Sequence, residues 1–202
     1  MHPNAHFAWT DIAAMRAFVA ARAFAHVFAQ TPDGPMVAHA PVVVTADGDL
    51  QFHLARANRL VAHLDGLTAL VSVTGDDAYV SPDWYAKPDQ VPTWLYLAVE
   101  ADGVVHRLEQ AGLVAQLDAL SAAMEEPLAP KPVWTRGKMT EGKFEAMLPG
   151  IVGFEMKVTA LRGTLKMNQH KPPEDIASLV VGLRAQGRED VAALVERHAR
   201  RT

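Results

Sequence analysis

Two tight turns in the first third of the chain constrain its fold more than any other feature. Residues 31–34 (TPDG) and 46–49 (ADGD) have turn composition, because proline presets φ and glycine tolerates positive φ. The flanking residues 23–30, 36–44 and 50–55 are apolar or alternate apolar with polar, which predicts three short strands. Strands joined this closely pair in an antiparallel meander, which favours a sheet or barrel over βαβ units.

The rest of the chain adds helices and further strands to this meander. Apolar residues three and four apart predict helices, and runs rich in β-branched residues predict strands. The expected helices cover 12–22, 58–64, 108–124, 141–148 and two segments of 174–200 that separate at Gly187. The expected strands cover 67–74, 94–105, 151–161 and 164–167. Residues 102–103 form a turn or a bulge within the strand 94–105, residues 162–163 form a turn between two strands, and residues 76–92 form a long loop. About seven strands in this order predict an α+β fold, a barrel with added helices.

We expect one domain over residues 1–202. Prolines mark residues 127–149 as a linker and helix insertion, and residues 173–202 form the C-terminal helices. Residues 196–201 (ERHARR) are basic, and we interpret their charges as those of an ordinary solvent-exposed helix surface. The sequence has no helix-turn-helix pattern. Binding to DNA would therefore need an unusual surface or a partner.

Composition narrows the class of protein. Half of the 202 residues are hydrophobic and the net charge is −4, which argues against disorder and against a surface that coats nucleic acid. The absence of cysteine excludes a disulfide framework, a thiolate nucleophile and a Cys-ligated zinc site. The apolar runs are too short to span a membrane, and the N-terminus lacks a signal-peptide pattern. We expect a cytoplasmic protein without a membrane partner.

Two kinds of catalytic site find little support in the sequence. The nine histidines are scattered and do not have the spacing of a metal-binding motif. A metal site would require the fold to bring distant histidines together, and we expect none. Ser81 has no base beside it in the sequence, which argues against a serine hydrolase.

Six short motifs resemble the PaiB-like family, the FMN-binding negative transcriptional regulators. The motifs are residues 39–42 (HAPV), 52–58 (FHLARAN), 78–85 (AYVSPDWY), 91–94 (VPTW), 151–155 (IVGFE) and 166–169 (KMNQ). The resemblance extends from about residue 6 to 187. It implies a split β-barrel, the fold of flavin-reductase-like and pyridoxamine-phosphate-oxidase-like proteins. It also implies a homodimer with FMN at the subunit interface and, as in some members, repression of protease and sporulation genes.

The sequence departs from this family pattern at two places. Leu95 stands where the family usually has Asn after VPTW, and residues 167–170 (MNQH) replace the more usual LSQN, so that the segment ends at His170. These departures fall in predicted pocket segments and leave the ligand open.

One segment has the chemistry to bind the phosphate of FMN. Arg56, Asn58 and Arg59 lie where a strand passes into the N-terminus of a short helix, so cationic donors and the positive end of the helix dipole converge. The alternative is that both arginines are solvated surface charges and that Asn58 only caps the helix.

The resemblance assigns further flavin contacts. It implies that Lys166 and Gln169 reach the phosphate or ribityl region, with a polar strand end as the alternative. Split barrels tend to present the backbone of the third strand, here His53 and Leu54, to the flavin ring. His39 lies in the matching second-strand motif. Each histidine could instead be a hydrogen-bonded structural residue.

Aromatic surface and hydroxyl groups come from the AYVSPDWY and VPTW motifs. The candidates for flavin contact are Tyr79, Ser81, Trp84 and Trp94. The alternative is that Trp84, Tyr85 and Trp94 anchor the core or a dimer interface, where aromatic residues are enriched.

Three functions follow from these observations. The first is an FMN-binding split-barrel homodimer with a regulatory role. The second is an FMN-dependent NAD(P)H oxidoreductase, in which the flavin carries out the redox chemistry and no residue must act as a general acid or base. The third is a protein that binds haem or another planar ligand, suggested by Leu95 and His170.

Overall fold

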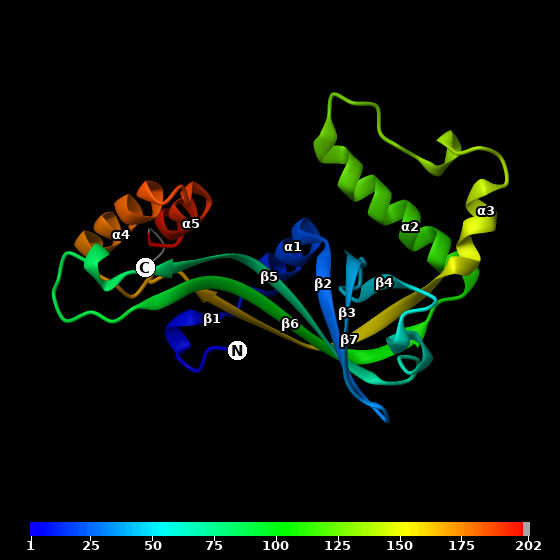
Figure 1. The fold of residues 1–202 in the computed structure, drawn as a ribbon, viewed down its shortest axis with the longest axis horizontal. Helices are drawn as coiled ribbons and strands as arrows, with labels where there is room; N and C mark the ends of the chain where they lie inside the picture. Colours follow the sequence, from blue (N-terminus) through cyan, green and yellow to red (C-terminus); the bar gives the residue numbers. More distant parts are fainter. Residues whose placement is uncertain (200–202) are drawn as a thin grey trace. The chain divides into compact units, whose positions relative to one another are not determined.

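Seven β-strands form one sheet in the computed structural model, which describes residues 1–199 (Figure 1). The strands are β1 (Ala8–Trp9), β2 (Phe24–Thr31), β3 (Gly34–Val44), β4 (Leu50–Ala55), β5 (Thr68–Val80), β6 (Thr93–Arg107) and β7 (Ile151–Lys166). Their order is β1-β7-β4-β3-β2-β5-β6, and an additional pairing of β7 with β6 closes the sheet. The α+β barrel predicted from the sequence is therefore confirmed.

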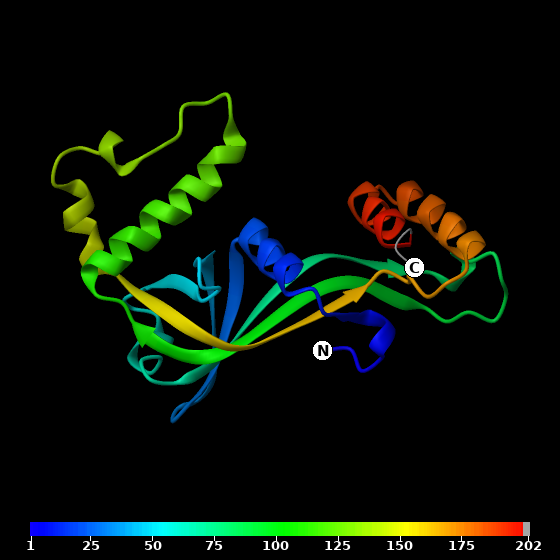
Figure 2. The ribbon, with the colours of Figure 1, turned by 180° about the vertical axis from the view of Figure 1, so that it is seen from behind.

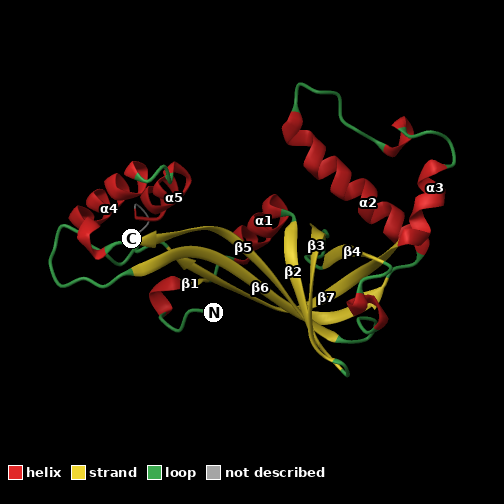
Figure 3. Ribbon diagram, viewed as in Figure 1, coloured by secondary structure: helices red, strands yellow, loops and turns green. Residues whose placement is uncertain are grey.

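Over residues 1–199, five α-helices and six short 3-10 helices accompany the sheet (Figure 3). The α-helices are α1 (Ile12–Arg22), α2 (Gln110–Glu125), α3 (Lys143–Met147), α4 (Pro173–Ala185) and α5 (Glu189–Ala199). The 3-10 helices are η1 (Ala5–Phe7), η2 (Arg59–Ala62), η3 (Pro82–Trp84), η4 (Glu126–Leu128), η5 (Arg136–Lys138) and η6 (Leu148–Gly150). Within residues 1–199, no helix has the length and apolar character needed to cross a membrane.

The chain divides into two compact units, which we describe separately. The barrel unit comprises residues 12–73 and 100–161, and the terminal unit comprises residues 1–11, 74–99 and 162 onward. Strands β5, β6 and β7 contribute residues to both units.

Alternating burial along the meander builds the core of the barrel unit. β2 pairs with β3 from Phe24↔Pro41 to Thr31↔Gly34, as the TPDG turn predicts. Phe52 of β4 and Phe154 of β7 are fully buried and stack with ring centroids 5.7 Å apart. The opposite face of the meander leaves apolar side chains in water: Phe24 is 53% exposed, and Phe28 and Val37 are also exposed.

Two strands are longer than the sequence predicted. β5 continues through the first part of the expected loop at 76–92, because Ala78 and Val80 are buried on either side of the exposed Tyr79. β7 runs without interruption, so the predicted turn at 162–163 is wrong. Gly163 instead pairs with Trp9 of β1, a two-residue strand that the sequence did not predict.

Gly103 lies where the sequence predicts a turn or a bulge within the strand, and β6 continues through it. A Cβ at Gly103 would lie 2.1 Å from the carbonyl oxygen of Lys157 in β7. The glycine therefore permits a close approach of two strands rather than a change of direction.

The terminal unit carries the two C-terminal helices that the sequence predicts. Helices α4 and α5 lie side by side (Figures 1 and 2) and separate around Gly187, whose φ of 71° favours glycine. The buried carboxylate of Asp175 in α4 accepts hydrogen bonds from the backbone N–H groups of Ala86 (3.0 Å) and Lys87 (3.1 Å). Arg200 and Arg201 of the predicted basic end lie outside the described residues.

Candidate functional site

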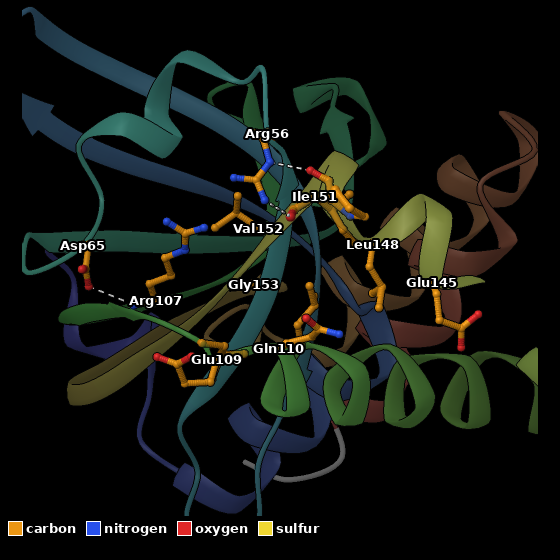
Figure 4. A pocket seen from close by; sticks show the side chains of 13 residues that line it. Arg56, Asp65, Arg107, Glu109, Gln110, Glu145, Leu148, Ile151, Val152 and Gly153 are labelled. Atoms are coloured by element: carbon orange, nitrogen blue, oxygen red, sulfur yellow. Dashed lines mark hydrogen bonds between the residues drawn. The ribbon is translucent and has the colours of Figure 1, made fainter. Parts of the chain in front are cut away.

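A cavity of about 530 Å³ opens in the barrel unit (Figure 4). It is bounded by the residue after β4, by the end of β6 with the start of α2, and by the turn from α3 into β7. Binding pockets for small molecules typically have volumes of about 300–1,000 Å³. The cavity is therefore large enough for a small organic ligand.

Arg56 is fixed to the wall of this cavity. Its backbone N–H donates to the carbonyl oxygen of Gly150 (2.8 Å), and its Nε donates to the carbonyl oxygen of Pro149. Its Nη2 donates a longer hydrogen bond, 3.4 Å, to the carbonyl oxygen of Ile151 (Figure 4). A guanidinium group has five N–H donors, so three of them remain available to a ligand.

A second arginine, Arg107, faces the same cavity from the end of β6. Its backbone N–H donates to Oδ1 of Asp65 (2.9 Å), which fixes the strand end, and Figure 4 shows its guanidinium group directed toward that of Arg56. The carboxylates of Asp65, Glu109 and Glu145 also line the cavity. Among residues 1–199, none of these carboxylates forms a salt bridge with Arg56 or Arg107. Two guanidinium groups without a carboxylate partner favour binding of an anion, above all a phosphate.

Part of the cavity lining is apolar. Leu108, Leu113, Leu148 and Val152 contribute side chains to it, among the polar side chains that make up the rest of the lining. Gly153 allows α2 to pack closely on β7, since a Cβ there would lie 3.1 Å from Leu113 and 3.3 Å from Leu108. Cations together with apolar side chains suit a ligand that joins a phosphate to a planar ring.

Of the predicted phosphate-binding segment, only Arg56 lines the cavity. Asn58 caps η2, and its Oδ1 accepts a hydrogen bond from the N–H of Leu60 (3.0 Å). Arg59, the first residue of η2, is exposed and is not among the residues that line the cavity.

His53 and Leu54 of β4 have partners inside the barrel unit. The Nδ1 of His53 lies 3.0 Å from Oε1 of Gln116 in α2, and burial lowers the pKa of His53, which favours the neutral ring. The Nε2 of Gln116 is buried and has no hydrogen-bond partner among residues 1–199. The Leu54 side chain is buried.

His39 lies on the exposed face of the β2–β3 hairpin, away from the residues that line the cavity. The register sets it directly opposite His26, with ring centroids 4.9 Å apart in an edge-on arrangement. Across residues 1–199, no three His, Asp or Glu side chains converge in a way that could hold a metal ion.

The predicted aromatic contacts lie in the terminal unit. Tyr79 and Trp94 form an exposed edge-on pair with ring centroids 6.1 Å apart. Ser81 caps η3 by accepting a hydrogen bond from the N–H of Asp83 (3.3 Å). Trp84 packs on Gly182 of α4, where a Cβ would lie 2.6 Å from the indole. Tyr79 and Trp94 are therefore the two that offer free aromatic surface.

Lys166 and Gln169 also lie in the terminal unit, at the end of β7. The Nζ of Lys166 donates to Oγ1 of Thr93 (2.8 Å). The Gln169 amide is used within the chain: its Nε2 donates to the carbonyl oxygens of His6 and Leu165, and its Oε1 accepts from the N–H of Met167. Gln169 thus shapes the turn after β7.

The two departures from the family pattern differ in their surroundings. Leu95 is fully buried, so an apolar side chain fits its position in the core. His170 is exposed, and its ring lies 5.1 Å from that of Phe7 and 6.2 Å from that of His6.

Sequence reasoning missed Arg107. The signal that singled out Arg56, an arginine between a predicted strand and a predicted helix, also applies to Arg107, which lies between the predicted strand 94–105 and the predicted helix 108–124. The sequence did not reveal that both strand ends border one cavity.

Comparisons with known proteins give a consistent relationship. The model of the family described as “Putative FMN-binding domain” matches residues 1–160. The chain is 26% identical over 200 residues to “Protease synthase and sporulation protein PAI 2” of Bacillus subtilis, an alignment that covers 97% of this chain and 95% of that protein.

Solved structures show the same fold at low sequence identity. The “FAD and Heme binding protein” of Mycobacterium smegmatis matches with a TM-score of 0.60 and 17% identity, covering 87% of this chain and 80% of that one. The flavocytochrome Anf3 of Azotobacter vinelandii matches with a TM-score of 0.58 and 16% identity, covering 82% of this chain and 72% of that one.

Proposed function

The chain belongs to the family described as “Putative FMN-binding domain”, and from this membership we propose that it binds FMN in the cavity of the barrel unit. The observation that carries the assignment of the site is the pair of arginines, Arg56 and Arg107, which face one cavity without a carboxylate partner among residues 1–199.

The cavity residues fit the chemistry of FMN. The phosphate needs cationic donors, which the two guanidinium groups supply. The isoalloxazine ring needs an apolar surface, which Leu108, Leu113 and Val152 offer. The volume of about 530 Å³ lies in the usual range for a small-molecule site.

The residues of the chain would bind and orient the cofactor. Arg56 is held by backbone carbonyls, so little side-chain freedom is lost when its remaining donors bind a phosphate. Arg107 stands on a strand end fixed by Asp65. Bound FMN supplies hydride or single-electron transfer.

We further propose that the protein is a homodimer in which the second subunit completes the flavin site. The exposed apolar side chains of Phe24, Phe28 and Val37 support this, because they lie together on one face of the meander. Light scattering should give twice the chain mass, and Phe28→Ser should shift it toward the monomer.

We also propose a regulatory role. It is supported by the similarity to “Protease synthase and sporulation protein PAI 2” along nearly the whole chain. Such a role implies a DNA or protein partner and a place in the cytoplasm. Selection of genomic DNA fragments on the immobilised protein, with and without FMN, tests it: flavin-dependent enrichment of specific fragments is expected, and no enrichment would argue against DNA as the partner.

Titration with FMN and riboflavin tests the cofactor assignment. FMN should bind at least about tenfold more tightly than riboflavin, because only FMN has the phosphate that the arginines bind. Failure of FMN to bind would overturn the proposed function.

A further inference from the structure

Two lysines that lie at and beyond the end of β7 have only neutral hydrogen-bond partners. The Nζ of Lys166 donates to Oγ1 of Thr93 (2.8 Å), and the Nζ of Lys171 donates to Oε1 of Gln90 (2.5 Å). His170 lies between them in the sequence. These three residues form what we call the cationic segment of the terminal unit.

Other cations of the terminal unit pair with carboxylates. Lys87 forms an ion pair with Glu174 (2.9 Å), and Arg188 forms one with Asp190 (3.3 Å). Within residues 1–199, no carboxylate forms an ion pair with the cationic segment. Aromatic rings compensate part of its charge: the Nζ of Lys171 lies 5.0 Å from the ring centroid of Tyr85.

The pKa values of two side chains in this segment are lowered. Burial lowers the pKa of Lys166. Burial lowers the pKa of His170, and the charges of Lys171, His6 and Lys166 lower it further. A bound anion would offset the repulsion that the neighbouring charges exert on protonated His170.

An open groove of about 1050 Å³ adjoins the cationic segment within the terminal unit. His170 and Lys171 line this groove, and so do Ile176, Val180 and Val181 of helix α4. Val181 is 68% exposed, so its aliphatic side chain projects into water. The groove therefore combines cationic donors with an apolar wall.

A third cation in the groove is already neutralised. Arg184 pairs with Glu189 (3.0 Å) and with Glu196 (3.3 Å), and Glu196 also lines the groove. Among the described residues that line the groove, Lys171 is therefore the one lysine or arginine without a carboxylate partner.

We propose that this groove binds an amphipathic organic anion, whose acidic headgroup contacts Lys171 and His170 and whose apolar body packs against Ile176 and Val181. The charge of the segment determines the headgroup, and the apolar face of α4 determines the body. The inference does not depend on the proposed flavin site, which uses residues of the barrel unit only. It provides a second ligand, an effector, for a protein with a regulatory role.

Isothermal titration with dodecanoate, below its aggregation concentration, tests the proposal. Dodecanoate has both the acidic headgroup and the apolar body, dodecanol lacks the charge, and sulfate lacks the apolar body. Lys171→Gln removes the headgroup contact, and Val181→Asp places a like charge on the exposed wall. Lys87→Gln is the matched control, because it removes a lysine from the same unit outside the groove. Thermal unfolding verifies that each variant is folded.

We expect saturable binding of dodecanoate and binding at least about tenfold weaker for dodecanol and sulfate. Lys171→Gln and Val181→Asp should each weaken dodecanoate binding by about tenfold or more, and Lys87→Gln should leave it unchanged. Absence of saturable binding, equal affinity for dodecanol, or an unaffected Lys171→Gln variant would overturn the proposal.

Titration with FMN distinguishes this site from the flavin site. FMN should not displace dodecanoate, and Lys171→Gln should bind FMN as the wild type does. Displacement of dodecanoate by FMN, together with loss of FMN affinity in Lys171→Gln, would assign the cations to the flavin phosphate and overturn the effector site. Failure of FMN to bind at all would refute the proposed function while leaving the dodecanoate result to stand alone.

Discussion

Replacing Arg107 with alanine separates phosphate binding from folding. Within residues 1–199 the Arg107 side chain has no hydrogen-bond or ion-pair partner, and only its backbone N–H is bound, to Asp65. A charge-assisted contact to a phosphate contributes about 1.5–3 kcal/mol, which corresponds to about a 10–150-fold change in Kd. Arg107→Ala should therefore weaken FMN by about this factor, leave riboflavin nearly unchanged, and leave the melting temperature where it was.

Fluorescence titration with both flavins measures these effects, and two further arginines provide the comparison. Arg56→Ala should weaken FMN to a similar extent but also lower the melting temperature by about 2–4 °C, because the exposed contacts to Pro149 and Ile151 contribute about 1 kcal/mol. Arg59→Ala, outside the cavity, should change neither property. Equal losses of FMN and riboflavin in Arg107→Ala, or no loss, would refute the assignment of the phosphate.

Three other changes test the fold that holds the site. Gly103→Ala should lower the free energy of unfolding by about 2–4 kcal/mol in urea titrations, because its Cβ would meet the Lys157 carbonyl oxygen at 2.1 Å; an unchanged stability would show that β6 and β7 separate readily. Asp175→Asn should cost about 1–2 kcal/mol and speed hydrogen exchange at the amides of Ala86 and Lys87, and unchanged exchange rates would argue against the bond. The pKa of His53 is lowered in the folded state, so the unfolded chain takes up its proton more readily and stability falls as the pH drops from about 6.5 toward the lowered pKa. His53→Gln should remove that share of the acid sensitivity, and pH-dependent unfolding curves that coincide for the two proteins would contradict this.

Local signals explain which parts of the fold were predictable. The TPDG turn, helix α1 and strand β4 were predicted with the bounds observed, because each is determined by neighbouring residues. The full length of β7 was not predictable, because its last part pairs with β1, as in Ala8↔Thr164, at the other end of the chain. Gly163 in this strand suggests a turn in the sequence, but in the structure it pairs with Trp9 of β1.

The same distinction applies to the candidate site. Arg56 was identified from its place after a strand and before a short helix. The alternative interpretation of that segment, in which Asn58 caps the short helix, is confirmed for Asn58. Arg107 and Asp65 meet across 42 residues of sequence, and no local pattern connects them with Arg56. The cavity forms where the ends of several strands meet in the tertiary structure. The pattern of apolar residues within one strand or helix does not show which strand ends will meet.

The visible absorption spectrum of the purified protein, before and after FMN is added and the sample is desalted, tests the central claim most directly. The account predicts flavin bands that survive desalting, with about one FMN per chain. A colourless protein that neither retains FMN nor quenches its fluorescence would contradict it.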